Sequence, residues 1–285
     1  MQAVRIVAIY REEIYSNRAI DADKAIMDAL IERLKASLGV RGEFLLLKPE
    51  KGLDSLLSLD IDLVVTMAQS SASLQLLDQL EKRGVKIINS SLSINNCMRQ
   101  TLSELLRANN VSYPKYQESP VSELTSLGID WSTGYWIKRG DFHAVDDDDV
   151  IYCESLASVK QIAKQFHKRK VDRVIVQEHK RGELFKFYGV KDAFLSLRYI
   201  GKIGNSRFDL ESGNQDCEFD RKQIETDIHR AANHLQLDFF GGDFIVDEKG
   251  DCHFIDFNDW PSFRTCREQV SLVMANYIQR KMGWI

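Results

Sequence analysis

Residues 241–258 read GGDFIVDEKGDCHFIDFN. Two apolar runs, residues 241–246 and 252–258, flank a polar segment, and this pattern predicts a β-hairpin closed by a tight turn through residues 247–251. The expected register places Asp243 opposite Asp256, Phe244 opposite Ile255 and Val246 opposite His253. The hairpin therefore carries two acids on facing positions of an otherwise apolar stretch.

The acids of this hairpin predict a metal site. Because strand residues alternate between faces, Asn258 shares a face with Asp256, and Asp243 faces them from the other strand. Two carboxylates about 5 Å apart repel by roughly 3 kcal/mol at an effective dielectric near 20, so this pair needs compensation. Carboxylate and amide oxygens favour Mg²⁺ or Mn²⁺, with positions left for water and phosphate oxygens. The alternative is a solvated hairpin, which the apolar neighbours of each acid disfavour.

The composition favours an intracellular protein that acts on small molecules. With 285 residues and 44% hydrophobic content, the chain can bury a sizeable core. Its net charge of -4 leaves no basic field for nucleic acid or an anionic membrane. The five cysteines are odd in number and contain no C-x-x-C pair, which argues against disulfides and zinc. The apolar start is expected to be a strand rather than a signal peptide, so we expect a cytoplasmic protein.

The first ninety residues alternate strand and helix patterns. Strands are expected at residues 4–10, 44–47, 63–67 and 85–88, and helices at residues 21–38 and 71–83. This alternation predicts parallel strands with crossover helices, that is, a Rossmann-like sheet. One further helix is expected over residues 94–109.

The second half predicts an α+β unit. Strands are expected at residues 135–138, 173–177, 184–190 and 194–200, the last two antiparallel, and helices at residues 156–169 and 223–235. The four-acid run at residues 146–149 is expected to lie in a solvated loop.

The order of these parts resembles the ATP-grasp superfamily, within it the branch of RimK-like peptide ligases, D-alanine ligases and inositol trisphosphate kinases. The resemblance rests on a lysine-bearing strand (Tyr135-Trp136-Ile137-Lys138), a hinge at residues 174–178, and Asp243 followed by Asp256-Phe257-Asn258-Asp259-Trp260-Pro261. It covers nearly the whole chain. It implies an α/β and α+β fold, with a Rossmann-like domain at residues 1–93 and an ATP-grasp domain at 94–285. The nucleotide cleft would lie between subdomains of about 115–180 and 181–285.

The resemblance also implies roles for individual residues. Asp243, Asp256 and Asn258 would hold Mg²⁺ (or Mn²⁺) bridging the ATP β- and γ-phosphates. Lys138 and His143 would contact the phosphates, and Arg99 would be a basic contact of the nucleotide. Lys186 would point into the cleft, bind the nucleotide and act in catalysis by offsetting charge on the phosphoryl oxygens. Gln177 and Glu178 would line the adenine cleft, Glu183 would bind the ribose, and Arg198 would stabilise the transferring phosphoryl group.

Three of these assignments have structural alternatives. Lys138 could be an exposed lysine at a strand end, Arg99 an ordinary surface arginine, and His143 a cap of its own loop. That loop, residues 140–144, holds one glycine where family members often carry several, so closure over the phosphates is less well supported.

The leading functional hypothesis is an ATP-dependent ligase that joins a small-molecule carboxylate to an amine through an acyl phosphate, with a homodimer possible. One alternative is a kinase of the inositol phosphate type. The expected acceptor loop disfavours a polyphosphate, because its acids, Asp209, Glu211, Asp216, Glu218 and Asp220, outnumber Lys202, Arg207 and Arg221. Another alternative is a nucleotide-binding module that senses ATP without turnover.

Overall fold

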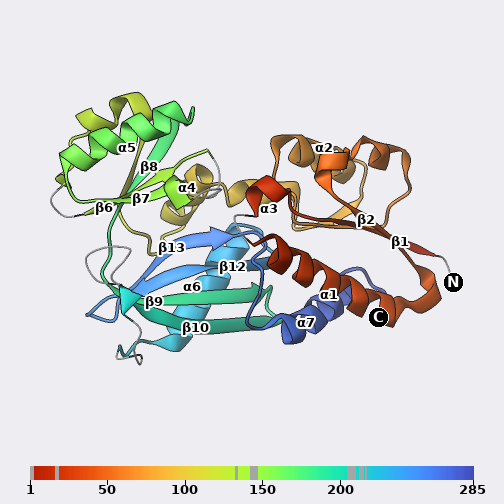
Figure 1. Ribbon diagram of the computed structural model, residues 1–285. Coiled ribbons are helices and arrows are strands. Elements are labelled where there is room, and N and C mark those ends of the chain that lie inside the picture. The colour runs from red at the N-terminus through yellow and green to blue at the C-terminus, as the bar shows by residue number, and fades with distance from the viewer. Residues whose placement is uncertain are drawn as a thin grey trace.

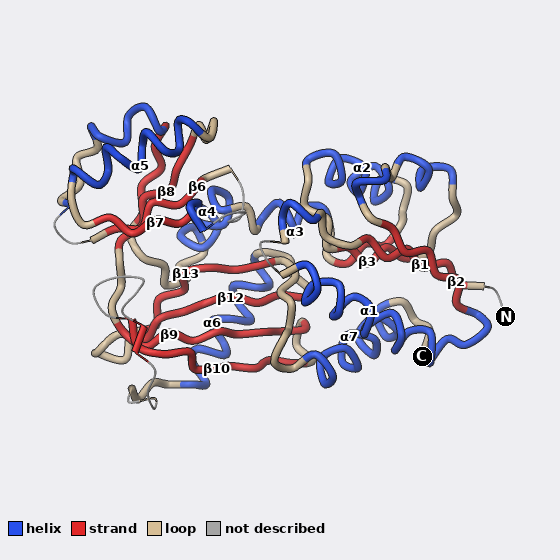
Figure 2. The backbone as a smooth tube through the Cα atoms, viewed as in Figure 1, coloured by secondary structure: helices blue, strands red, loops and turns tan. Residues whose placement is uncertain are grey.

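A computed structural model describes residues 3–16, 19–131, 134–141, 147–203, 210, 211, 215 and 217–285. These residues form three β-sheets, with helices packed against them (Figures 1 and 2). The strand orders are β2-β1-β3-β4, β5-β8-β6-β7 and β11-β10-β9-β12-β13. Short 3₁₀ helices occupy Glu13–Tyr15, Gly39–Arg41, Pro49–Lys51, Asp54–Ser58, Val121–Ser126 and Asp147–Asp149.

The first sheet is parallel, as the alternation predicts. Its strands are β1 (Val4–Ile9), β2 (Gly42–Leu47), β3 (Leu63–Thr66) and β4 (Lys86–Ile88), and its helices are α1 (Ile20–Leu38) and α2 (Ser71–Lys82). All pairings in this sheet are parallel. In open parallel sheets, ligand sites lie beyond the carboxyl ends of the strands, and here residues after those ends bond Asp259, in the loop that follows residues 252–258.

The prediction of a single helix over residues 94–109 is wrong. The chain forms two helices, α3 (Ser91–Asn96) and α4 (Arg99–Ala108), separated at Cys97 and Met98. Cys97 is fully buried in a core that it shares with residues of α6 (Arg221–His234), and Met98 takes an extended backbone before α4. The turn therefore places Arg99 at the start of a new helix.

The second sheet is antiparallel and carries the lysine strand. It comprises β5 (Tyr116–Pro120), β6 (Tyr135–Arg139), β7 (Val150–Cys153) and β8 (Arg173–Glu178), with α5 (Leu156–Lys168) packed on one face. β5 and β7 are edge strands that the sequence pattern missed. The four-acid run is not wholly solvated, because Asp149 is fully buried and pairs with Arg169 at 2.7 Å.

The third sheet contains the hairpin. Its strands are β9 (Gly182–Val190), β10 (Phe194–Ile203), β11 (Leu210–Glu211), β12 (Phe239–Val246) and β13 (Cys252–Asn258), and α6 (Arg221–His234) covers one face. β9 and β10 pair antiparallel, as expected. The hairpin strand β12 lies in the interior of this sheet, while β13 is its edge.

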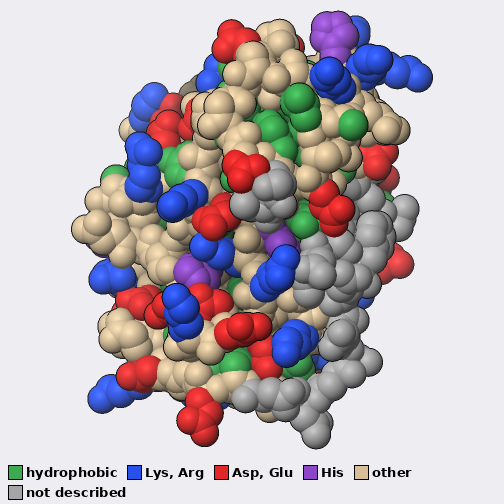
Figure 3. All heavy atoms as spheres, turned by 90° about the vertical axis from the view of Figure 1, so that its left-hand side faces the viewer, with side chains coloured by type: hydrophobic (Ala, Val, Ile, Leu, Met, Phe, Trp, Pro, Cys, Tyr) green, Lys and Arg blue, Asp and Glu red, His purple; other side chains and the backbone are tan. Residues whose placement is uncertain are grey.

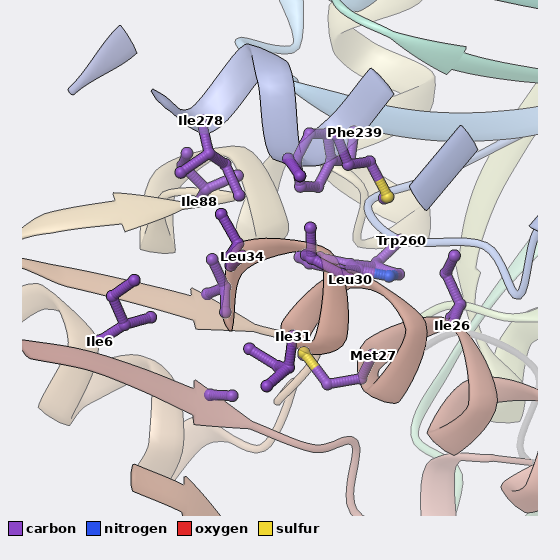
Figure 4. Packing of buried hydrophobic residues seen from close by; sticks show 14 of the residues in the cluster. Ile6, Ile26, Met27, Leu30, Ile31, Leu34, Ile88, Phe239, Trp260 and Ile278 are labelled. Carbon is purple, nitrogen blue, oxygen red and sulfur yellow. The ribbon is translucent and has the colours of Figure 1, made fainter. Parts of the chain in front are cut away.

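The C-terminal helix, α7 (Arg267–Lys281), packs against α1 and so brings the two ends of the chain together. Figure 1 shows α7 running beside α1, and both contribute to one apolar core. In Figure 4, Trp260 and Phe239 from the third sheet's region lie among side chains of α1 such as Leu30. Residues from the end of the chain thus cover part of one face of the first sheet. The domain boundary expected at residue 93 stays a prediction.

Candidate functional site

The hairpin brings Asp243 and Asp256 directly opposite each other, as predicted. The rest of the expected register is wrong: Phe244 faces Phe254, Ile245 faces His253 and Val246 faces Cys252. The difference is a β-bulge, because Ile255 is an extra residue between the pairs at Phe254 and Asp256. The bulge separates the acidic pair from the turn at residues 247–251.

The acidic pair belongs to a row of four charges across four strands. Asp256 on β13 faces Asp243 on β12, which faces Lys186 on β9, which in turn faces Arg198 on β10. Directly opposite residues in antiparallel strands project from the same face of a sheet. Lys186 Nζ lies 2.7 Å from Asp243 Oδ1. Two acids and two cations therefore line one face.

Burial and neighbouring charges shift the ionisation of this row. Burial raises the pKa of Asp243, Asp256 raises it further, and the ammonium of Lys186 opposes both effects. Burial disfavours the charged form of Lys186, but its ion pair with Asp243 leaves the pKa of Lys186 raised. A second positive charge near the two carboxylates would relieve their repulsion.

Lys138 supplies such a charge from the second sheet. Only 8% of its surface is exposed, so the alternative of an exposed strand-end lysine is wrong. Its Nζ donates to the carbonyl of Ile255 at 3.2 Å, beside the acidic pair. Burial, followed by the charge of Arg99, lowers the pKa of Lys138 to about 8, although Asp256 and Asp243 act in the opposite direction.

Arg99 begins α4 and is also buried, so it is not an ordinary surface arginine. Its Nη1 donates to the carbonyl of Arg139, the last residue of the lysine strand, at 2.8 Å. The break between α3 and α4 therefore directs a cation toward the end of β6 that carries Lys138.

A pocket of about 250 Å³ opens next to Lys138, between the second and third sheets. It is lined by Trp136, Lys138, Val150, Gln177, Glu178, Lys180, Ile203, Ile245 and Ile255. Gln177 and Glu178 are among its lining residues, and their role at an adenine cleft stays a prediction. The sequence analysis did not assign Trp136 or Lys180 to the site. Trp136 could have been found, because strand alternation places it on the same face as Lys138.

The structure does not bring Glu183 into this pocket. Glu183 neighbours Leu184 on β9, so it projects from the face opposite to that of Lys186. It is buried, and its Oε1 accepts a hydrogen bond from the backbone N–H of Cys217 at 3.1 Å. Its expected contact with a ribose is therefore not supported by a position in this pocket, and it stays a prediction. His143 lies outside the described residues.

The donor set fits a hard divalent cation. Asp243 and Asp256 offer carboxylate oxygens, and Asn258, two residues after Asp256 on β13, offers an amide oxygen on the same face. Within the ranges that the structure describes, no group of three or more His, Cys, Asp or Glu side chains forms a metal site. Two carboxylates and one amide would leave positions of a six-coordinate ion for water and phosphate oxygens.

The molecular surface carries charges of both signs. Figure 3 shows acidic and basic side chains interspersed over the face it presents, as expected from the net charge of -4. Among the described residues, no helix has the length and apolar character needed to cross a bilayer.

Solved structures similar to this chain include ligases and an ATP-grasp protein. D-alanyl-alanine synthetase A from Vibrio cholerae gives a TM-score of 0.71 at 12% identity, over 99% of this chain and 98% of that chain. The D-alanine–D-alanine ligase from Bacillus anthracis complexed with ATP gives the same values. The RimK domain ATP-grasp protein from Sphaerobacter thermophilus gives 0.64 at 14%, over 96% and 99%. No protein-family model and no curated protein matches the sequence.

Proposed function

We propose, starting from the ATP-grasp fold that this chain has, that it is an ATP-dependent carboxylate–amine ligase. A substrate carboxylate would attack the γ-phosphorus of ATP, the bond to the bridging oxygen would break, and ADP would leave. An amine would then attack the acyl carbon, and inorganic phosphate would leave. The observation that carries this proposal is the row of Asp256, Asp243, Lys186 and Arg198 beside Lys138 and the pocket.

The proposed metal ligands are Asp243, Asp256 and Asn258. Bound Mg²⁺, or Mn²⁺ in its place, would neutralise charge on the β- and γ-phosphate oxygens. Lys186 and Lys138 approach the acidic pair from two different sheets, so they can bind phosphate oxygens on both sides of the metal. This arrangement accounts for cations and half-buried anions in close proximity.

Arg198 and Arg99 complete the proposed cationic environment. Arg198 is exposed at the end of the charge row, beyond Lys186, where it can stabilise charge on the transferring phosphoryl group. Arg99 bonds the carbonyl of Arg139, the residue next to Lys138, and would bind the nucleotide phosphates from there. Both roles are electrostatic, as is typical of phosphoryl transfer.

The pocket beside Lys138 is the proposed nucleobase site. Its volume of about 250 Å³ is below the range of roughly 300–1,000 Å³ typical of whole-ligand sites, which suits a planar base whose phosphates extend past Lys138. Gln177 and Glu178 would offer the polar groups of the hinge, and Trp136 and Ile245 the apolar walls. We propose that this cleft separates subdomains of about 115–180 and 181–285, with residues 1–93 as a preceding domain.

The two alternatives predict different products. A kinase for a polyphosphate would need a basic acceptor site, whereas Glu218 and Asp220 are exposed alongside Lys202 and Arg221. Asp209, Arg207 and Asp216 of the same loop lie outside the described residues. The ligase is therefore favoured, while the substrates, a homodimer and a cytoplasmic location stay predictions.

Hydroxylamine trapping tests the reaction type. With ATP, Mg²⁺ and a panel of carboxylates, the protein is expected to form hydroxamates, because hydroxylamine attacks an acyl phosphate in place of the amine. The measurement is mass spectrometry of the products together with ADP release. A phosphorylated alcohol without hydroxamate would contradict the ligase and support the kinase. Nucleotide binding without ADP release would support the ATP sensor instead.

The lowered pKa of Lys138 predicts proton uptake on nucleotide binding. In the free protein Lys138 loses its proton above pH 8, and phosphate binding favours the charged form and so raises its pKa. At about pH 8.5, well above a phosphate pKa near 6, binding is expected to take up more than about half a proton. Calorimetry in two buffers of different ionisation enthalpy measures this uptake. Uptake that persists in Lys138→Met would assign it to another group.

A further inference from the structure

The carboxyl ends of three parallel strands hold the loop that follows the hairpin. Asn89 directly follows β4, Gln69 lies shortly after β3, and Arg11 shortly after β1. Asn89 Nδ2 donates to the carbonyl of Asp259, and Gln69 Nε2 donates to Asp259 Oδ1 at 2.6 Å. Arg11 Nη2 donates to the carbonyl of Trp260 at 2.5 Å. The first sheet thus contacts the residue next to the proposed ligand Asn258.

The amide of Asn89 also holds the beginning of β12. Its Oδ1 accepts from the backbone N–H groups of Asp238 and Phe239 at 2.9 and 3.0 Å, and its Nδ2 donates to the carbonyl of Phe239 at 2.7 Å. Together with the bond to Asp259, both donors and both lone pairs of the amide are used. Asn89 is 1% exposed, so losing these bonds would leave buried polar groups without partners.

We propose that Asn89 is a positioning residue that sets the geometry of the metal ligands from outside the hairpin; this inference rests on the proposed function. β12 and β13 are joined covalently only at the turn, and the bulge at Ile255 lies between that turn and the acidic pair. The ladder pairs Asp243 with Asp256 and Gly241 with Asn258, while the bulge uncouples this end of the hairpin from the turn. At the open end of the hairpin, the amide of Asn89 ties the two strands together.

Packing keeps the loop in place independently of Asn89. Trp260 is fully buried, and its ring packs edge-on against Phe239 with centroids 4.9 Å apart. Figure 4 shows Trp260 beside Ile26 and Leu30 of α1. Replacing Asn89 should therefore disturb the alignment of the ligands more than it disturbs the fold.

The test is Mn²⁺ affinity in the presence of a non-hydrolysable ATP analogue, measured by electron paramagnetic resonance. Asn89→Asp keeps an acceptor for the N–H groups of Asp238 and Phe239 but removes the donors to the carbonyls of Asp259 and Phe239. We expect its Mn²⁺ dissociation constant to rise by about 10- to 100-fold, the range for partners that orient metal ligands. Gln69→Met removes the other donor to Asp259 and leaves β12 untouched, and a rise of about tenfold is expected.

Asn96 provides a matched control. It is 7% exposed, and its Nδ2 donates to the carbonyl of Leu235 at 3.1 Å, so it also links the α3 region to the third sheet's helix. Asn96→Ala is expected to lower the unfolding temperature without changing Mn²⁺ affinity. Wild-type affinity in both Asn89→Asp and Gln69→Met would overturn the inference, as would an equal loss in Asn96→Ala. If the wild-type protein binds no Mn²⁺ in the presence of the nucleotide analogue, that result contradicts the proposed function itself rather than the role of Asn89.

Discussion

Replacing Asp256 with asparagine is expected to lower the ATP turnover rate by about 1,000-fold or more, because a metal ligand contributes several kcal/mol of charge stabilisation in the transition state. Asparagine keeps the size of the side chain and one oxygen, but it removes the negative charge that faces Asp243. ADP release in steady-state assays at saturating Mg²⁺ measures the effect. Unchanged turnover would exclude the proposed coordination.

The same substitution should not destabilise the protein in the absence of divalent metal. Asp256 contributes to the raised pKa of Asp243, which reflects repulsion between the two carboxylates in the folded chain. The substitution removes that repulsion and also the attraction between Asp256 and Lys138, so the unfolding temperature is expected to change little, as measured by calorimetry in EDTA. A clear fall in unfolding temperature would mean that Asp256 serves the fold rather than the metal.

Replacing Lys138 with methionine is expected to lower kcat/KM for ATP by about 100- to 1,000-fold, comparable with the loss of one preorganised donor at a developing charge. Methionine fills most of the same buried volume, so the pocket wall is kept while the ammonium is lost. The fold should be retained or stabilised, because burial already disfavours the charged form of Lys138.

Lys164 on α5 is the control for Lys138. It belongs to the same sheet-and-helix layer but is exposed, so Lys164→Met is expected to leave kcat/KM for ATP unchanged. If both variants lose activity equally, the loss reflects a general effect of charge. If Lys138→Met keeps wild-type kcat/KM, Lys138 does not contact the phosphates.

The pairing of Asp243 with Asp256 could be predicted because it follows from the pattern of residues close in sequence. Alternation in both runs and a turn between them were sufficient to place Asp243 opposite Asp256. The bulge was not visible, since an extra residue such as Ile255 has no distinctive side chain, and it shifted all pairs on the turn side. The break at Cys97 was hidden for a related reason: the helical pattern continues through it, and only burial in a distant core shows where the chain turns.

Contacts distant in sequence could not be predicted. Asn89 and Asp259 are separated by 170 positions, and no local pattern marks a polar side chain that will bond another strand's backbone. For Glu183 a local pattern was available. Its residue type suited a ribose contact, but strand alternation counted from Lys186 places its side chain on the opposite face of β9. The period of two was therefore the better guide than residue type within the third sheet.

The most direct test of the account is the position of the metal. Crystals grown with Mn²⁺ and a non-hydrolysable ATP analogue, examined by anomalous diffraction, are expected to show Mn²⁺ about 2.0–2.3 Å from oxygens of Asp243, Asp256 and Asn258, with phosphate oxygens completing the coordination. Nucleotide bound beside Lys138 without Mn²⁺ at these three side chains, or Mn²⁺ bound elsewhere on the protein, would contradict it.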